Sequence, residues 1–112
     1  MLRYLLLLLT GVASADALIV GGWSATAVTT DTRAALVRAL SKTNVCMKSI
    51  LWARSQVVAG MNYEFHIDGC RGVHGGECGN ACKSPRRFSV VVFDQPWTHT
   101  TIVTSVSETE NL

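Results

Sequence analysis

The stretch that decides the fold is ARSQVVAGMNYEFHID, residues 53–68 of a chain of 112 residues. Its second half alternates between apolar and polar side chains, which is typical of a strand with one buried and one solvent-facing side. A long run rich in β-branched and aromatic residues, Val45 to Val58, comes before this alternating half, and Ala59-Gly60 separates the run from it. Because glycine tolerates the positive φ angles of tight turns, we expect an antiparallel hairpin here.

A helix is predicted before this hairpin and a second hairpin after it. Residues 28–42, VTTDTRAALVRALSK, place apolar side chains at helical spacing and so indicate one amphipathic helix. Phe88 to Gln95 and Thr100 to Val106 have strand-like composition. Pro96-Trp97 belongs to the turn between them, because proline cannot donate a hydrogen bond to a strand ladder. The expected fold class is α+β, with the helix covering the apolar face of an antiparallel sheet.

The N-terminal residues 1–17, MLRYLLLLLTGVASADA, have the pattern of a secretory signal peptide. Arg3 gives the basic start, Leu5 to Leu9 give the apolar run, and small residues follow. Cleavage is expected after Ala15 or Ala17, which leaves residues 18–112 as the folded domain. A membrane anchor is the alternative, but the apolar run is far shorter than the roughly 20 residues that span a bilayer. We therefore expect a secreted, extracellular protein that does not bind membranes.

Secretion determines how the cysteines are interpreted, because thiols form disulfides in oxidising compartments. Cys46, Cys70, Cys78 and Cys82 allow three pairings into two bridges. If the first hairpin turns at Val58, Cys46 and Cys70 are equally far from the turn and face each other across the strands. We therefore favour the bonds Cys46–Cys70 and Cys78–Cys82.

A zinc site is the alternative use of this cluster. Cys70, His74, Cys78 and Cys82 have nearly the spacing of a zinc knuckle. In a secreted protein disulfides are the favoured interpretation, so we expect no metal and no other cofactor.

The composition argues against several classes of function. The formal charge is only +2, whereas nucleic-acid-binding domains normally carry a strong basic excess. No cysteine or serine lies in a recognisable nucleophile motif, and His66, His74 and His99 are expected on a strand face, in a loop and in a turn. No glycine-rich phosphate loop opens the helix. We therefore do not expect an enzyme.

Apolar residues occupy the turns, where polar ones are usual. Val57-Val58-Ala59 lies at the tip of the first hairpin and Pro96-Trp97 at the tip of the second. A third apolar stretch, Leu18-Ile19-Val20, precedes Gly21-Gly22. Because hairpin tips cannot easily turn back into a core, the two tips predict an exposed hydrophobic interface.

These positions carry a resemblance to a known family. Gly21-Gly22, Gln56-Val57-Val58-Ala59-Gly60 and Pro96-Trp97, in this order, are similar to the three motifs of the cystatins. The resemblance implies a four- to five-stranded antiparallel sheet wrapped around one α-helix. It also implies a reversible, non-covalent inhibitor of papain-like cysteine proteases that blocks the cleft as a three-part wedge. The opening Gly21-Gly22-Trp23-Ser24 and the small number of cysteines resemble cystatin-like proteins of oomycetes or plants more than the secreted vertebrate type.

By this resemblance, the protease partner, of papain or cathepsin type, is contacted at three places. Ile19 and Val20 enter the non-primed subsites while Gly21 lets the backbone pass close to the catalytic thiol. The remaining contacts come from Gly22 and the two hairpins. The full set of expected contact residues is Ile19, Val20, Gly21, Gly22, Gln56, Val57, Val58, Ala59, Gly60, Pro96 and Trp97. A monomer is expected, with a domain-swapped dimer as the alternative.

A second hypothesis keeps the fold without the inhibition. In it, the chain is a binding module whose basic loop, with Arg71, Lys83, Arg86 and Arg87, contacts an anionic surface. Fold alone does not determine function, and these charges could equally serve only to keep the loop soluble.

Overall fold

The computed structural model describes residues 22–109. Its elements are β2 (Trp23–Thr26), α1 (Thr30–Leu40), β3 (Val45–Val58), β4 (Gly60–Arg71), β5 (Gly76–Glu77), β6 (Arg86–Gln95), the 3₁₀-helix η2 (Pro96–Thr98) and β7 (Thr100–Thr109). The expected signal peptide lies outside these residues. None of the helices that the structure describes is long and apolar enough to cross a membrane.

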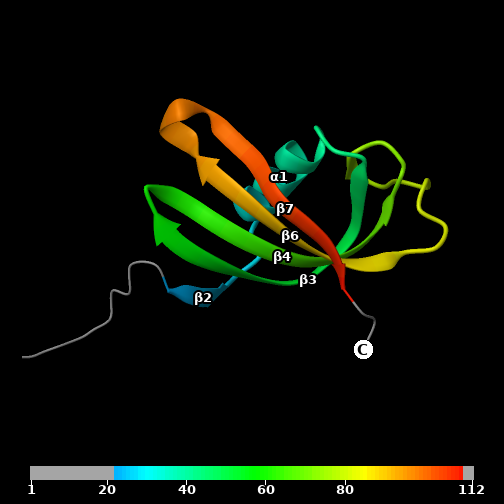
Figure 1. The fold of residues 1–112 in the computed structure, drawn as a ribbon, viewed down its shortest axis with the longest axis horizontal. Helices are drawn as coiled ribbons and strands as arrows, with labels where there is room; N and C mark the ends of the chain where they lie inside the picture. The colour runs from blue at the N-terminus through cyan, green and yellow to red at the C-terminus, as the bar shows by residue number, and fades with distance from the viewer. Residues whose placement is uncertain (1–21, 110–112) are drawn as a thin grey trace, which may run out of the picture.

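The described strands form one six-stranded sheet around α1 (Figure 1). Antiparallel pairing gives the order β2-β3-β4-β6-β7, and the two-residue strand β5 adds a parallel pair to β3. The expected α+β class and both hairpins are confirmed. β2 and β5 were not expected as separate strands, because four and two residues are too few to show a period in the sequence.

Helix α1 is fixed by its cap and by one apolar stripe. The Thr29 hydroxyl accepts a hydrogen bond from the Thr32 backbone nitrogen at 3.2 Å. The Thr32 hydroxyl in turn accepts one from the Thr29 nitrogen at 2.7 Å, which closes a capping box. The side chains that α1 buries against the sheet are Ala35, Leu36, Ala39 and Leu40. The inward side chains of the central strands complete the core, among them Phe65, Ile67, Phe88, Val90 and Val92.

Two β-bulges bend β3 over the helix. Each inserts one unpaired residue, Lys48 between Met47 and Ser49 and Leu51 between Ile50 and Trp52. Both inserted side chains are exposed. Because a bulge increases local twist and bends the strand, the pair lets one long strand follow the curve of the core.

The bulges also correct the reasoning about the cysteines. The turn centres on Ala59, with Val58 opposite Gly60, rather than on Val58. Cys46 nevertheless lies opposite Cys70, as expected, because the two inserted residues shift the register back. The expected opposition is thus confirmed, although the position of the turn was wrong by one residue.

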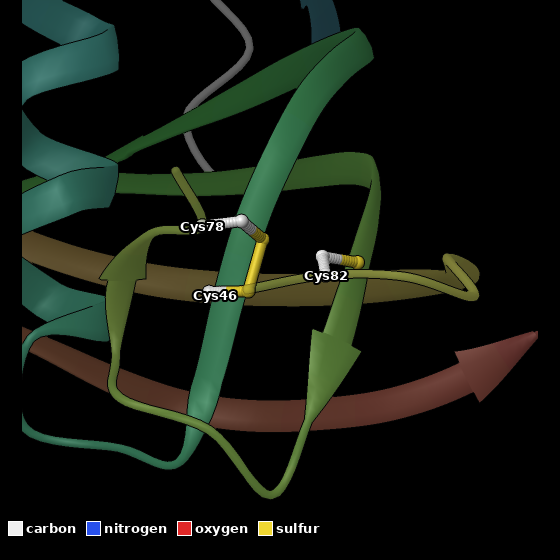
Figure 2. Close-up of side chains that lie close together, drawn as sticks. All are labelled: Cys46, Cys78 and Cys82. Carbon is white, nitrogen blue, oxygen red and sulfur yellow. A yellow bond between two sulfur atoms is a disulfide. The ribbon is translucent and has the colours of Figure 1, made fainter. Parts of the chain in front are cut away.

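The expected disulfide pairing is wrong. The bonds are Cys46–Cys78 and Cys70–Cys82, not Cys46–Cys70 and Cys78–Cys82. The cause is β5, which pairs with β3 at the edge away from β4, so that the Cys78 nitrogen donates to the Met47 carbonyl at 3.0 Å. This contact places Cys78 beside Cys46, as Figure 2 shows. All four cysteines are consumed by these bonds, so the disulfide interpretation is confirmed over zinc coordination by thiolates.

Candidate functional site

The register of the sheet places three of the sequence motifs at one end. A row of paired residues crosses it: Trp23, Gln56, Asn62, Phe93 and Ile102. The two hairpin turns extend beyond this row, and Gly22 directly precedes it (Figure 1). We call this end the tip edge and define it as Gly22, Val57 to Gly60 and Pro96 to His99. Segments more than 30 residues apart in the sequence therefore form one continuous edge.

The first tip is a very tight turn with apolar side chains outward. Ala59 is its apex, and the exposed fractions of Val57 and Val58 are 54% and 37%. Gly60 has φ +111°, and a Cβ at this position would lie 2.8 Å from the Asp94 carbonyl oxygen. Glycine is required here both by the backbone angle and by the close approach of β6.

The second tip presents a tryptophan to solvent. Pro96–Thr98 form one 3₁₀ turn, closed by a hydrogen bond from the His99 nitrogen to the Pro96 carbonyl at 3.0 Å. His99 then reverses the chain in the left-handed region, with φ 55°. Trp97 is 67% exposed, so the expectation that it does not fold against the sheet is confirmed.

Gln95 connects the two tips, and sequence reasoning missed it. Its side-chain nitrogen donates to the Ala59 carbonyl oxygen at 2.8 Å. Its side-chain oxygen accepts from the Thr98 hydroxyl at 2.7 Å, which orients the amide. A polar residue directly before Pro96-Trp97 is the only sequence signal of this contact, and on its own it resembles ordinary strand-end polarity.

Behind the tips, Gln56 is half-buried and links neighbouring strands. Its side-chain oxygen accepts a hydrogen bond from the Asn62 amide at 2.8 Å across the hairpin, and its backbone is paired with Trp23 of β2. Gln56 thereby joins the first hairpin to the strand that leads from Gly22. Ile19, Val20 and Gly21 lie outside the described residues.

The outward face next to the tip edge carries an aromatic and ionic network. The Arg54 guanidinium lies 5.0 Å from the centre of the Trp23 ring and donates to the Glu64 carboxylate at 2.7 Å. The other Glu64 oxygen lies 2.6 Å from a His66 ring nitrogen, and His66 stacks on Trp52. Burial raises the pKa of Glu64, but the hydrogen bonds from Arg54 and His66 outweigh it and leave that pKa lowered.

Asp94 lies beneath the second tip and is almost completely buried. It accepts a hydrogen bond from the Thr101 hydroxyl at 2.7 Å and lies 3.8 Å from the Arg38 guanidinium. Burial first, and then the charges of Asp94 and Asp31, raise the pKa of Tyr63 on the neighbouring strand. The contacts of Asp94 with Thr101 and with Arg38 of α1 connect the base of the second hairpin to the helix.

The three histidines come from three different parts of the fold. His66 is on the outward sheet face, His74 contacts the Glu77 carbonyl at 2.9 Å in the disulfide-bonded loop, and His99 ends the second tip. All cysteines are in disulfides. The described residues therefore bring together an apolar edge, and the chemistry such an edge supports is burial against a partner.

Comparison with known proteins finds similarity in sequence and in fold. No protein-family model matches the chain. The chain is 36% identical over 103 residues to "Cystatin-like cysteine protease inhibitor EPIC4" of Phytophthora infestans, covering 80% of this chain and 60% of that protein. A protein of the same name from strain T30-4 matches with the same values. The chain thus spans less than two thirds of the length of these curated relatives.

Solved structures share the fold at low sequence identity. A salivary cystatin from the soft tick Ornithodoros moubata superposes with a TM-score of 0.63 at 21% identity, covering 82% of this chain and 100% of that one. Mialostatin, a gut cystatin from the hard tick Ixodes ricinus, gives a TM-score of 0.54 at 17% identity, covering 81% and 100%. The chain is thus similar in sequence to a cystatin-like protein over part of that protein's length, and it shares the fold of solved cystatins.

Proposed function

We propose that this protein is a reversible, non-covalent inhibitor of papain-like cysteine proteases, and that the tip edge fills the active-site cleft. The observation that carries the proposal is the alignment of both apolar tips and Gly22 at one end of a single sheet. The Phytophthora relatives are named as cysteine protease inhibitors, which supports the class of target.

The physical action of the wedge is exclusion of water and substrate. Val57, Val58 and Trp97 leave water when they dock, which contributes the main favourable free energy. The residues before Gly22 would occupy the non-primed side, with Gly21 allowing the backbone to approach the catalytic thiol without presenting an attackable bond. Because the sheet holds both tips in place before docking, little conformational entropy is lost on binding.

The direct test is inhibition of papain by purified, disulfide-bonded residues 18–112. We expect tight inhibition that is reversed by dilution, with the intact mass of the inhibitor unchanged afterwards. Folded protein that does not inhibit papain-like proteases would refute the proposed function. Inhibition accompanied by cleavage or by a covalent adduct would refute the non-covalent mechanism.

The wedge makes a sharper prediction for single residues. Trp97→Ala should weaken binding by about 2 kcal/mol or more, or roughly 30-fold, because a central exposed tryptophan is a typical interface hot spot. Leu51→Ala is the matched control, since Leu51 is an exposed apolar side chain at a bulge away from the tips. Deletion of residues 18–20 should also weaken binding. Equal effects of the Trp97 and Leu51 variants would contradict the wedge.

We also propose that the protein acts outside the cell as a monomer. Two disulfides in a small domain are typical of oxidising compartments and support secretion. N-terminal sequencing of protein exported from a eukaryotic host should show a start at Asp16 or Leu18. Retention of Met1 in exported protein would contradict the signal peptide, and a dimer of defined mass in light scattering would favour strand exchange.

A further inference from the structure

Three cationic side chains surround one hollow at the end of the sheet opposite the tip edge. Arg71 ends β4, Arg86 begins β6, and Lys83 comes from the loop between them. The end of this loop is yellow in Figure 1. The hollow has a volume of about 360 Å³ and also includes Ser84. We call it the basic pocket.

The fold holds two of these cations together covalently. Arg71 follows Cys70 and Lys83 follows Cys82, and the Cys70–Cys82 bond joins the two segments with their Cα atoms 5.5 Å apart. The Arg71 guanidinium also lies 5.2 Å from the centre of the Phe88 ring, which orients it at the wall of the pocket. The disulfide therefore keeps the backbone segments that carry these two like charges close together, although charge repulsion opposes this arrangement.

The acidic side chains nearby do not balance this charge. Glu108 also lines the pocket, but it is already bonded to Arg86 at 2.6 Å. Among the residues that the structure describes, neither Arg71 nor Lys83 has a carboxylate within 4.0 Å. Arg87, the fourth basic residue of the loop region, is 3.5 Å from Asp68. Within residues 22–109, two positive charges thus face the pocket without an acidic partner.

We propose that the basic pocket binds the oxyanion of a sulfate or phosphate ester carried by a larger molecule. Arg71 and Lys83 would supply charged donors and Ser84 a hydroxyl donor, a set suited to tetrahedral oxyanions. Val73, which is half-buried, gives the same hollow an apolar side chain for the carbon skeleton that carries the ester. Its volume is at the lower end of the range of small-ligand sites, about 300–1,000 Å³.

This site is independent of the proposed inhibition. β4 runs from Gly60 at the tip edge to Arg71, and β6 runs from Arg86 to Gln95 at the tip edge. The pocket is therefore at the far end of both strands, so a ligand there leaves the tips free. Together with the proposed function, on which this use rests, the pocket would concentrate the inhibitor on a surface that carries such esters.

The experiment measures binding of disulfide-bonded residues 18–112 to two probes that share this chemistry. The first is a heparin-derived hexasaccharide, and the second is a neutral phosphatidylcholine vesicle doped with a phosphoinositide. Saturable binding to the hexasaccharide alone identifies sulfated glycans, and binding to the vesicle alone identifies lipid headgroups. Either result supports the pocket if the binding depends on the pocket residues. If neither probe binds saturably, the proposal is overturned.

Matched variants separate the pocket from net charge. Arg71→Gln combined with Lys83→Gln should lower affinity at least tenfold. Lys42→Gln combined with Lys48→Gln removes the same charge from positions outside the pocket and should change it less than twofold. Equal losses in the two double variants would overturn the proposal.

Two further measurements guard against misfolding. Lys83→Gln alone keeps the contact between Arg71 and Phe88 and should still lower affinity several-fold, whereas no change in this variant would contradict the site. Papain inhibition by all variants should equal that of the parent chain. If the parent does not inhibit papain but binds the probe through the pocket, the proposed function fails and the pocket stands.

Discussion

The hydrogen bond from Gln95 to the first tip offers the most specific test of how this molecule is built for docking. Gln95 is half-buried, and its amide nitrogen lies 2.8 Å from the Ala59 carbonyl oxygen while the Thr98 hydroxyl holds the amide oxygen. Removing the donor should let the tips move relative to each other in the free protein. Docking must then restore their arrangement, which costs affinity.

The magnitude follows from the chemistry of one bond. A neutral intramolecular hydrogen bond contributes about 0.5–1.5 kcal/mol net. A change of about 1 kcal/mol corresponds to roughly a fivefold increase in Kd. Gln95→Met keeps the length of the side chain without the donor and should show this effect. Gln95→Glu should be weaker still, because its carboxylate would face the Ala59 carbonyl and repel it.

The assay is inhibition of papain in steady state, together with thermal unfolding of the free inhibitor. We expect weaker binding, with the melting temperature of the Met variant little changed, since the bond lies at the exposed end of the sheet. The Ala59 carbonyl ¹³C shift, measured without protease, should move in both variants. If the shift moves but the affinity of both variants stays within twofold of the parent chain, the tips do not need this bond for docking. An unmoved shift would refute the bond itself.

Three other changes test the fold around the site. Gly60→Ala should lower the free energy of unfolding by about 1–3 kcal/mol in urea titration, because its φ is +111° and its Cβ would meet Asp94; an unchanged midpoint would contradict this. The lowered pKa of Glu64 means that its contribution to stability is present above its unfolded pKa near 4.5 and is lost as the pH falls through the lower folded pKa. Glu64→Gln should therefore flatten the acid limb of a plot of stability against pH, and a parallel curve would argue against it. Non-reducing peptide mapping should recover Cys70 linked to Cys82, and replacing both with alanine should cost about 3 kcal/mol; a different linkage would contradict the structure.

The exposure of the apolar tips is the part of the candidate site that local sequence patterns predict. Val57, Val58 and Trp97 could be recognised as exposed because alternation and turn residues place them at hairpin ends. Their exposure in the structure confirms this interpretation. The role of Ile19, Val20 and Gly21 stays a prediction, since they precede the described residues.

The disulfide bond of Cys46 shows what local sequence patterns cannot predict. The expectation that Cys46 lies opposite Cys70 was correct, because two bulges restore that register. The short strand β5 nevertheless decides that the sulfur of Cys46 bonds to Cys78. A bulge is one residue among fourteen in β3, and β5 has only two residues, so neither leaves a period that can be read from the chain.

The sequence by itself therefore determined the helix, the two hairpins and the character of their tips, because each depends on side-chain periods within a few residues. The tertiary structure alone decided the disulfide partners, the bond from Gln95 to Ala59 and the convergence of Arg71 with Lys83. These depend on how strands distant in the chain are aligned and on the directions of individual side chains. The physical reason is that periodicity specifies which face of an element is buried, whereas the pairing register and the path of the loops specify which residues meet.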